Sequence, residues 1–368
     1  MIRINSYNIG MRKFKYVLSV LLFATCLFSC NNRGGETYLA VTPVNLQGAD
    51  TLVLKEMPVG DYLVSYPEAM LLTTDGALIV QDRKGLSCLF HLIGKNEKTD
   101  GFAFQGNGPG EYLDANLNPF IDREGRIGFY DSSQKKVLIY QKRDGKYEPC
   151  KVIKISYKEE WVREMVGCGE YYLLTGEHGD FSDFRFLVTD SLGKLVSRFG
   201  DYPPVAPASF SRPADDMRKL LFSSSFWRIA PDKTKAVFAS YRGALIQFFD
   251  LSCLPDSVRE IKSLQLAPPI NFSQVTAGDE GWIYGFEDVF VTNHFVYAIY
   301  NGQTVRDNPE FGHYILKYDW EGNMINTYIA PIGIRSLAVD EARGLFYIAG
   351  YHDDEMALYV AEITDNPI

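Results

Sequence analysis

The chain has 368 residues, of which 46% are hydrophobic and 23% charged, and this composition excludes a disordered, collagen-like or coiled-coil protein. The formal net charge of -9 argues against a nucleic-acid-binding surface, which needs an excess of Lys and Arg. The 23 Tyr and 24 Phe residues favour β-strands.

Residues 1–29 have the features of a signal peptide. A basic region at residues 12–15 precedes the apolar run Tyr16–Phe28, which is too short to span a bilayer. The following residues, Leu27-Phe28-Ser29-Cys30, are typical of a bacterial lipobox. The sequence therefore predicts that residues 1–29 are removed and that Cys30 is lipidated.

Residues 30–49 are predicted to hold the lipidated cysteine and a flexible tether, because Asn31–Gly35 is polar and rich in glycine. The lipid would place the protein on the outer membrane, on either its periplasmic or its surface face. An ordinary secretory signal or an anchor helix is the alternative, and both Met1 and Met11 are candidate start sites. The later cysteines lack the spacing of a zinc site, and free thiols are favoured over disulfides.

Short strand-like runs recur along residues 50–368, separated by turns rich in Gly, Asp and Asn. The clearest repeated unit is a hairpin with an Asp-Gly turn at residues 75–76, which is a strong turn signal. Each hairpin is followed by a third strand and often by a fourth. Copies of the hairpin are expected at 69–80, 118–129, 165–174, 227–239, 289–299 and 334–348.

This repeat predicts an all-β fold, a six-bladed β-propeller with four-stranded antiparallel blades. The last copy ends with three strands, and the N-terminal segment Asp50–Met57 is expected to supply the missing outer strand and close the ring. A β-helix would need shorter and more regular coils, and a pair of β-sandwiches would not predict six hairpins. Residues 201–225, with a short helix at 215–221, and residues 301–311 are predicted insertions.

The segment Gln105–Tyr112 (QGNGPGEY) lies between the first two repeats. A G-x-G-P-G-E-[YF] element at this place, behind a lipobox, resembles the six-bladed β-propeller lipoproteins of the Bacteroidetes. These are TolB-like or NHL-like propellers of uncharacterised role. The resemblance covers essentially the whole mature chain. It implies the fold and an envelope location, and it implies no reaction and no catalytic residues.

We expect the glycine segment to be a tight connection between blades rather than a ligand site. A phosphate-binding loop needs a helix that opens directly after it, and the continuation Tyr112–Asp114 predicts none. Positive φ angles are expected at the glycines, and Glu111 is expected to cap backbone amides. The residues of the motif are Gly106, Gly108, Pro109, Gly110, Glu111 and Tyr112.

A ligand is expected at one end of the central channel, on the loops that join the second and third strands of each blade. Polar and aromatic residues recur there and would form a funnel suited to a sugar, a peptide or a partner protein. Exposure to water also explains polar loops, so the role of each single residue stays open. The candidates are Asp82, Arg83, Asp131, Glu177, His178, Tyr241, Arg242, Tyr300, Asn301, Tyr351 and His352.

The sequence contains no G-x-S-x-G nucleophile motif and no sialidase-type box, and we expect no catalytic residue and no cofactor. The leading hypothesis is a lipid-anchored envelope propeller that binds a partner protein or a glycan without catalysis. The alternative is a metal-dependent hydrolase or lyase. Its site at the channel mouth would bind an ion such as Ca²⁺ through Asp82, Asp131, Glu177, Asn301 and His352.

Overall fold

The computed structural model describes residues 40–57, 66–82, 84, 88–93, 99–115, 118–155, 162–176, 184–203, 222, 225–267, 283–304, 311–352 and 355–364. All of them belong to one compact unit, Leu39–Ile368. The predicted signal peptide, Cys30 and the predicted helix at 215–221 lie outside the described residues. Within the described part, no helix is long and apolar enough to cross a membrane.

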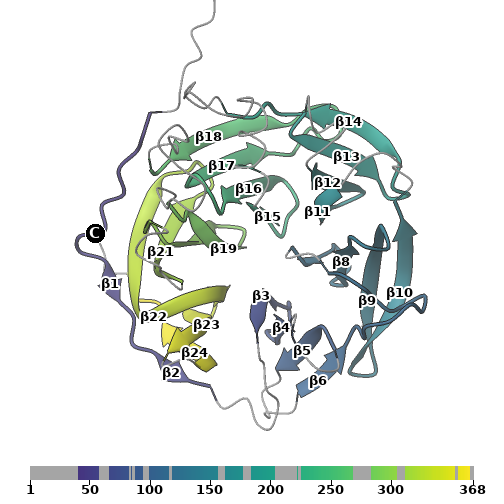
Figure 1. Ribbon diagram of the computed structural model, residues 1–368, viewed down its shortest axis with the longest axis horizontal. Helices are drawn as coiled ribbons and strands as arrows, with labels where there is room; N and C mark the ends of the chain where they lie inside the picture. The colour runs from purple at the N-terminus through teal and green to yellow at the C-terminus, as the bar shows by residue number, and fades with distance from the viewer. Residues whose placement is uncertain are drawn as a thin grey trace, which may run out of the picture. The chain divides into compact units, whose positions relative to one another are not determined.

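Blades one to four are separate four-stranded antiparallel sheets arranged around a ring (Figure 1). Their strands, in chain order within each blade, are β3 (Pro67–Leu72), β4 (Leu78–Asp82), β5 (Phe90–Ile93) and β6 (Thr99–Phe102); β7 (Phe120–Ile121), β8 (Ile127–Asp131), β9 (Lys136–Arg143) and β10 (Lys146–Lys154); β11 (Val162–Cys168), β12 (Tyr171–Gly176), β13 (Phe186–Asp190) and β14 (Leu195–Phe199); β15 (Ser225–Ile229), β16 (Lys235–Ser240), β17 (Leu245–Asp250) and β18 (Arg259–Gln265).

Blades five and six share one long strand, β22 (Met324–Asp340). Its first half pairs with β21 as the outer strand of blade five, and its second half pairs with β23 as the inner strand of blade six. The remaining strands of these two blades are β19 (Phe286–Val291), β20 (Phe295–Tyr300), β21 (Gly312–Asp319), β23 (Leu345–His352) and β24 (Glu355–Glu362). The six predicted hairpins and the all-β propeller are therefore confirmed.

An N-terminal strand closes the ring, as the sequence predicts, but the predicted segment Asp50–Met57 is divided into two short strands. β2 (Lys55–Glu56) pairs antiparallel with β24 and completes blade six. β1 (Asp50–Thr51) pairs in parallel with β22 on the outside of blade five. Figure 1 shows these first strands, in purple, beside the last strands of the chain, in yellow.

The core lies between the faces of neighbouring blades, where the strands carry aromatic and branched side chains. Between blades three and four, for example, the Phe186 and Trp227 rings pack edge to face at 4.6 Å. Four cysteines fall in the described part and all are free: Cys88 and Cys168 are buried, whereas Cys150 and Cys253 are exposed. The inner strands of the blades surround the axis of the ring, where a propeller has its central channel, and several carry buried polar side chains there.

Candidate functional site

Charged residues stand at the beginning of the inner strands, which surround the channel. In four blades the pairing of the first two strands shifts by one residue there, as in a β-bulge. A bulge inserts an extra residue and re-aims its side chain, which explains how a charged group can project from an otherwise apolar strand. The residues at these shifts are Glu68, Arg163, Glu287 and Arg335.

A chain of buried polar contacts crosses the middle of the channel and links five blades. Arg228 Nη2 lies 2.7 Å from Asp288 Oδ1, and Ser336 Oγ donates to Asp288 Oδ2 at 2.6 Å. Arg228 Nη1 also donates to Asn118 Oδ1, and Asn118 Nδ2 donates to Glu164 Oε2 at 2.5 Å. Burial raises the pKa of the Asp288 carboxyl, and the Arg228 guanidinium opposes that shift. We call these five residues the channel belt.

On the side of the second-to-third strand loops, the channel holds a second charged group, which we call the arginine cradle. Its members are Glu68 of blade one, Glu287 of blade five and Arg335 of blade six. Arg335 Nη2 lies 3.9 Å from Glu68 Oε1, and Arg335 Nη1 lies 3.9 Å from Glu287 Oε2. Asn301 Nδ2 donates to Glu287 Oε1 at 2.9 Å. Burial raises the pKa of Glu287, while Asn301 and Arg335 act against that shift.

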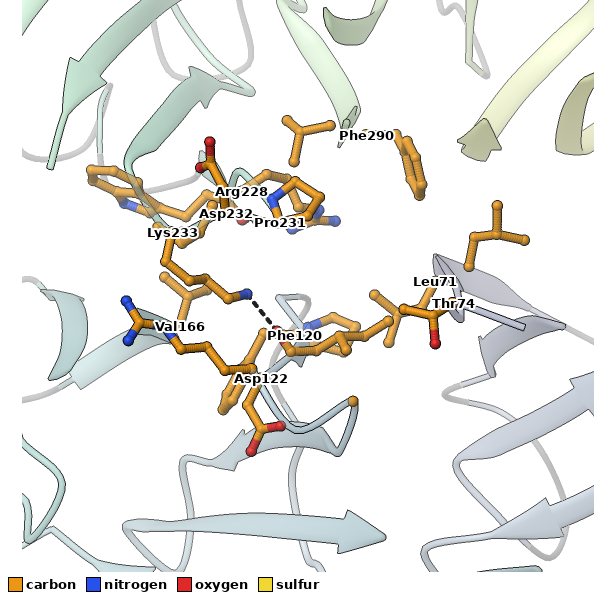
Figure 2. Close-up of a pocket in the computed structure, with 18 of the residues that line it drawn as sticks. Leu71, Thr74, Phe120, Asp122, Val166, Arg228, Pro231, Asp232, Lys233 and Phe290 are labelled. Atoms are coloured by element: carbon orange, nitrogen blue, oxygen red, sulfur yellow. Dashed lines mark hydrogen bonds between the residues drawn. The ribbon is translucent and has the colours of Figure 1, made fainter. Parts of the chain in front are cut away.

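On the other side of the channel, where the first-to-second strand hairpins turn, lies a pocket of about 450 Å³. Figure 2 shows its walls, which come from blades one to five. They are mainly apolar, and charged side chains stand among them and at the rim. Arg228 lines the pocket as well, so the channel belt separates it from the arginine cradle. The walls of this hairpin-side pocket include Leu71, Phe120, Asp122, Arg123, Val166, Trp227, Ile229, Asp232, Lys233 and Phe290.

Lys233 brings an ammonium group to the wall of the pocket from the turn of blade four. Its φ of 65° is in the left-handed region, and Nζ donates to the backbone oxygen of Ile121 at 2.5 Å (Figure 2). Burial lowers the pKa of Lys233, and the nearby Cys168 and Asp122 act in the opposite direction. The pocket therefore contains a partly desolvated cation of blade four that is held in place by the backbone of blade two.

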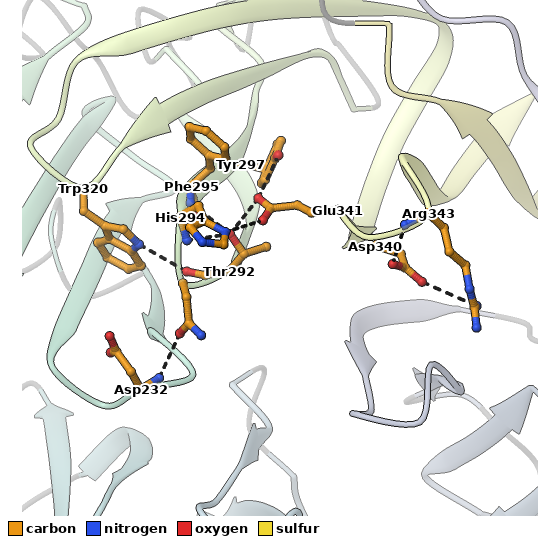
Figure 3. A network of polar contacts seen from close by, with 10 residues as sticks. Asp232, Thr292, His294, Phe295, Tyr297, Trp320, Asp340, Glu341 and Arg343 are labelled. Atoms are coloured by element: carbon orange, nitrogen blue, oxygen red, sulfur yellow. Dashed lines mark hydrogen bonds and ion pairs between the residues drawn. The ribbon is translucent and has the colours of Figure 1, made fainter.

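The turns of blades four, five and six are tied together beside this pocket (Figure 3). The Asp232 amide donates to Asn293 Oδ1 at 3.0 Å, which joins blade four to blade five. Glu341 of blade six accepts from Thr292 Oγ1 at 2.7 Å and lies 3.0 Å from His294 Nδ1. These contacts hold the three hairpin turns together, and Asp232 among them is a wall residue of the pocket.

The predicted channel-mouth residues separate into three groups. Asp82 and Asp131 are fully buried and accept hydrogen bonds from backbone amides, such as Tyr66 N to Asp82 Oδ1 at 3.0 Å and Leu113 N to Asp131 Oδ2 at 2.8 Å. They brace loops of the first two blades. Arg83, Glu177 and His178 lie outside the described residues, and so does the side chain of His352.

The third group is associated with the arginine cradle. Asn301 holds Glu287, and the ring of Tyr351 packs on Phe311, which lies beside Arg335. Tyr241 packs on Tyr284 with the ring centroids 5.2 Å apart. Burial raises the pKa of Tyr241, and the charge of Glu287 raises it further. Two other candidates lie nearby in the chain: Tyr300 is buried against Phe286, and Arg242 forms a backbone bridge with Tyr284.

Sequence reasoning missed the residues that the structure brings together in the channel. The cradle and belt residues stand at the start of the predicted hairpins, where a charged side chain interrupts an apolar run. A charged residue in an apolar run is visible in the sequence, and it could have identified these positions. The residues are Glu68, Glu164, Arg228, Glu287, Asp288 and Arg335.

Only three of the five predicted metal ligands have described side chains, so their convergence on an ion stays a prediction. Within the described part of the chain, no group of three or more His, Cys, Asp or Glu side chains is arranged to hold a metal ion. Asp82, Asp131 and Asn301 instead hydrogen-bond to nearby protein groups. The other two predicted ligands are Glu177, which is not described, and His352, whose side chain is not described.

The glycine motif is a compact loop in which the side chain of Glu111 occupies the space beside two glycines. Glu111 Oε2 accepts from the Gly108 amide at 2.7 Å. A Cβ on Gly106 would lie 2.1 Å from Glu111 Oε2, and one on Gly110 would lie 2.6 Å from Pro149 Cγ. The expectation of positive φ at these glycines is wrong, since none of them is in that region. Close approach of neighbouring groups, and not φ, requires glycine here.

Comparisons with known proteins agree with this architecture. A family profile described as "TolB-like 6-blade propeller-like" matches residues 48–342. A Bacteroides fragilis protein described as exported shares the fold at 13% identity, with 89% of this chain and 98% of that chain covered and a TM-score of 0.54. No curated protein matches significantly.

Two further solved structures are similar. A member of the DUF4221 family from Bacteroides vulgatus is 9% identical over 85% of this chain and 96% of its own, with a TM-score of 0.52. A gluconolactonase from Xanthomonas campestris is 10% identical over 84% of this chain and 89% of its own, with a TM-score of 0.51. At these identities the similarity shows the fold alone.

Proposed function

The chain belongs to the TolB-like 6-blade propeller-like family, and from this premise we propose that it is a binding protein of the cell envelope that holds a partner protein by the hairpin-side pocket. The observation that carries the proposal is the pocket itself. Its volume of about 450 Å³ is in the range of ligand sites, which bury apolar groups and orient them with a few polar ones.

The chemistry of the walls favours a protein partner over a glycan at this end of the channel. Aliphatic residues such as Val166 and Ile229 offer no hydrogen bond to a sugar hydroxyl, but they suit an apolar side chain of a partner. Asp122, Arg123 and Asp232 stand close by and can pair with polar groups around such an anchor. An apolar anchor in a pocket with a polar rim is the usual arrangement of a protein–protein hot spot.

The proposed location rests on the lipobox-like sequence Leu27–Cys30, together with the neighbour described as exported. We infer that a lipid on Cys30 holds the protein at the outer membrane. The test is metabolic labelling of cells with an alkyne-bearing fatty acid. The full chain should incorporate the label, and Cys30→Ser should not. Equal labelling of the two chains would overturn the lipid anchor without affecting the binding proposal.

The partner site is tested by photo-crosslinking in cells that express the full chain. A photoreactive residue at Asp232, on the pocket, should give a discrete adduct with a partner protein. The matched control is Leu192, an apolar residue 76% exposed in a turn of blade three. Phe290→Asp, which places a charge in the wall, should abolish the adduct while the protein stays folded. The same adducts from both positions, or none, would overturn the proposal.

The metal-dependent hydrolase or lyase stays a prediction, because it depends on Glu177 and His352. No observation on the described residues favours it over binding.

A further inference from the structure

Arg335 of the arginine cradle is a buried cation without hydrogen bonds of ordinary length among the described residues. The residue is 9% exposed. Its two nearest carboxylate oxygens, on Glu68 and Glu287, are both at 3.9 Å, beyond the range of an N–H···O hydrogen bond. Its Nε is fully buried and has no hydrogen-bond partner in the part of the chain that the structure describes. Since buried guanidinium groups are normally hydrogen-bonded, this side chain is placed to receive acceptors from another molecule.

The cradle is held in a fixed geometry from several sides. The Arg335 guanidinium lies 5.6 Å from the centre of the Tyr66 ring and 5.9 Å from that of Phe311. Asn301 orients Glu287. The residues that follow in the chain, Asp288 and Ser336, are hydrogen-bonded to each other in the channel belt. The channel belt therefore fixes the backbone that carries Glu287 and Arg335, and the site is preorganised.

The charges select the class of ligand. An anion would meet the two carboxylates of Glu68 and Glu287, and a cation would meet the guanidinium between them. A hydroxyl group avoids both conflicts, because it can accept from Arg335 and donate to a glutamate at once. One hydroxyl oxygen can bridge the 3.9 Å between an Arg335 nitrogen and a glutamate oxygen, since it hydrogen-bonds to both. A ligand with several adjacent hydroxyls would fill both gaps.

Aromatic rings complete the surroundings. Phe311 and Tyr351 pack with their centroids 5.8 Å apart, and the Tyr66 ring also lies near Arg335. Aromatic faces suit the C–H faces of a sugar ring, whereas the hydroxyl edge would meet the cradle. We propose that the arginine cradle is a second binding site, separate from the hairpin-side pocket, that takes a neutral saccharide.

The test uses the full chain in detergent with a panel of neutral mono- and disaccharides, including glucose, galactose, mannose, xylose and N-acetylglucosamine. Acetate represents anions and methylammonium represents cations. Saturation-transfer NMR and the rise of Tm with ligand concentration report binding. We expect saturable binding of at least one saccharide and none of the two ions. Binding of no saccharide, or binding of an ion in place of one, would overturn the proposal.

Variants locate the site. Arg335→Met should weaken saccharide binding at least about tenfold, because it removes the donors and keeps an unbranched apolar stem. Glu287→Gln and Phe311→Leu are milder substitutions, which serve as the test if Arg335→Met does not fold. Each of them should weaken saccharide binding severalfold. The matched control is Arg343→Met, in a turn on the opposite side of the channel. Unchanged affinity in all three cradle variants would contradict the assignment. A failed crosslink at Asp232 would leave this proposal intact, since the two sites are separate.

Discussion

Arg228 of blade four and Asp288 of blade five are 60 residues apart in the sequence, and their side chains lie 2.7 Å apart in the middle of the channel. Their partners Asn118 and Ser336 extend the contact to blades two and six. A buried pair costs desolvation when it forms, so its presence is weak evidence for added stability. It fixes the relative positions of the inner strands, on which both proposed sites depend.

Breaking this pair should destabilise the folded protein. Arg228→Met leaves Asp288 buried without its counter-ion, and we expect a loss of about 3–5 kcal/mol in the free energy of unfolding. The chain offers a matched control, since Arg259 and Asp250 also lie 2.7 Å apart but Arg259 is 72% exposed. Arg259→Met should change stability little. Urea unfolding of both variants measures the difference, and equal losses would contradict the role given to burial.

The glycine motif gives a second prediction. Gly106→Ala should lower the free energy of unfolding by about 1–3 kcal/mol, because the added Cβ meets Glu111 Oε2 at 2.1 Å. The control is the same substitution in a Glu111→Ala background, where the obstructing carboxylate is gone. Alanine should cost clearly less there. A cost independent of residue 111 would show that the backbone, and not the side chain, requires glycine.

His91 predicts how stability depends on pH. Burial lowers the pKa of this imidazole below its ordinary value near 6.5, and the charge of Asp82 opposes the shift. The unfolded chain therefore binds a proton before the folded one, and stability is lost as pH falls below 6.5. The urea midpoint should drop less between pH 7.5 and 5.5 in His91→Gln than in the unchanged protein. An equal drop in the two proteins would contradict the role given to His91.

The free cysteines predict a labelling pattern. Burial raises the pKa of the Cys168 thiol to about 11, so its reactive thiolate is scarce and also covered. Cys253 is exposed. At pH 7.5 a maleimide should modify Cys253 rapidly and Cys168 only after unfolding, as followed by peptide mass spectrometry. Comparable rates at the two thiols in the folded protein would contradict the burial of Cys168.

The fold could be predicted because each blade repeats a local signal. The Asp-Gly turn after β3 and its counterparts mark six hairpins, and period-two strands surround them. The division of Asp50–Met57 into two strands could not be predicted, since it depends on edges of β22 and β24 that lie far along the chain. The continuity of β22 through two blades could not be predicted either, because Pro331 and Gly333 in its middle are typical of a turn between two strands.

The channel chemistry was predicted less well, for a physical reason. Loops commonly carry function, yet Asp82 and Asp131 use their carboxylates to hold backbone amides. The charged residues that meet in the channel lie on inner strands. Sequence alone does not say that a one-residue bulge turns Glu287 or Arg335 toward the axis. The convergence of Glu68, Glu287 and Arg335 needs three blades in place.

The N-terminal closure of the ring has a mechanical consequence. Any pull on the chain ahead of residue 40 reaches the ring through contacts on three blades: Val41 beside β18, β1 beside β22, and β2 beside β24. Each contact is only one or two residues long, so we expect a pulling force to open them one after another. The first two can peel away while β2 still completes blade six. In a protein held at its N-terminus, these weak contacts would therefore separate before the blades around either end of the channel are deformed.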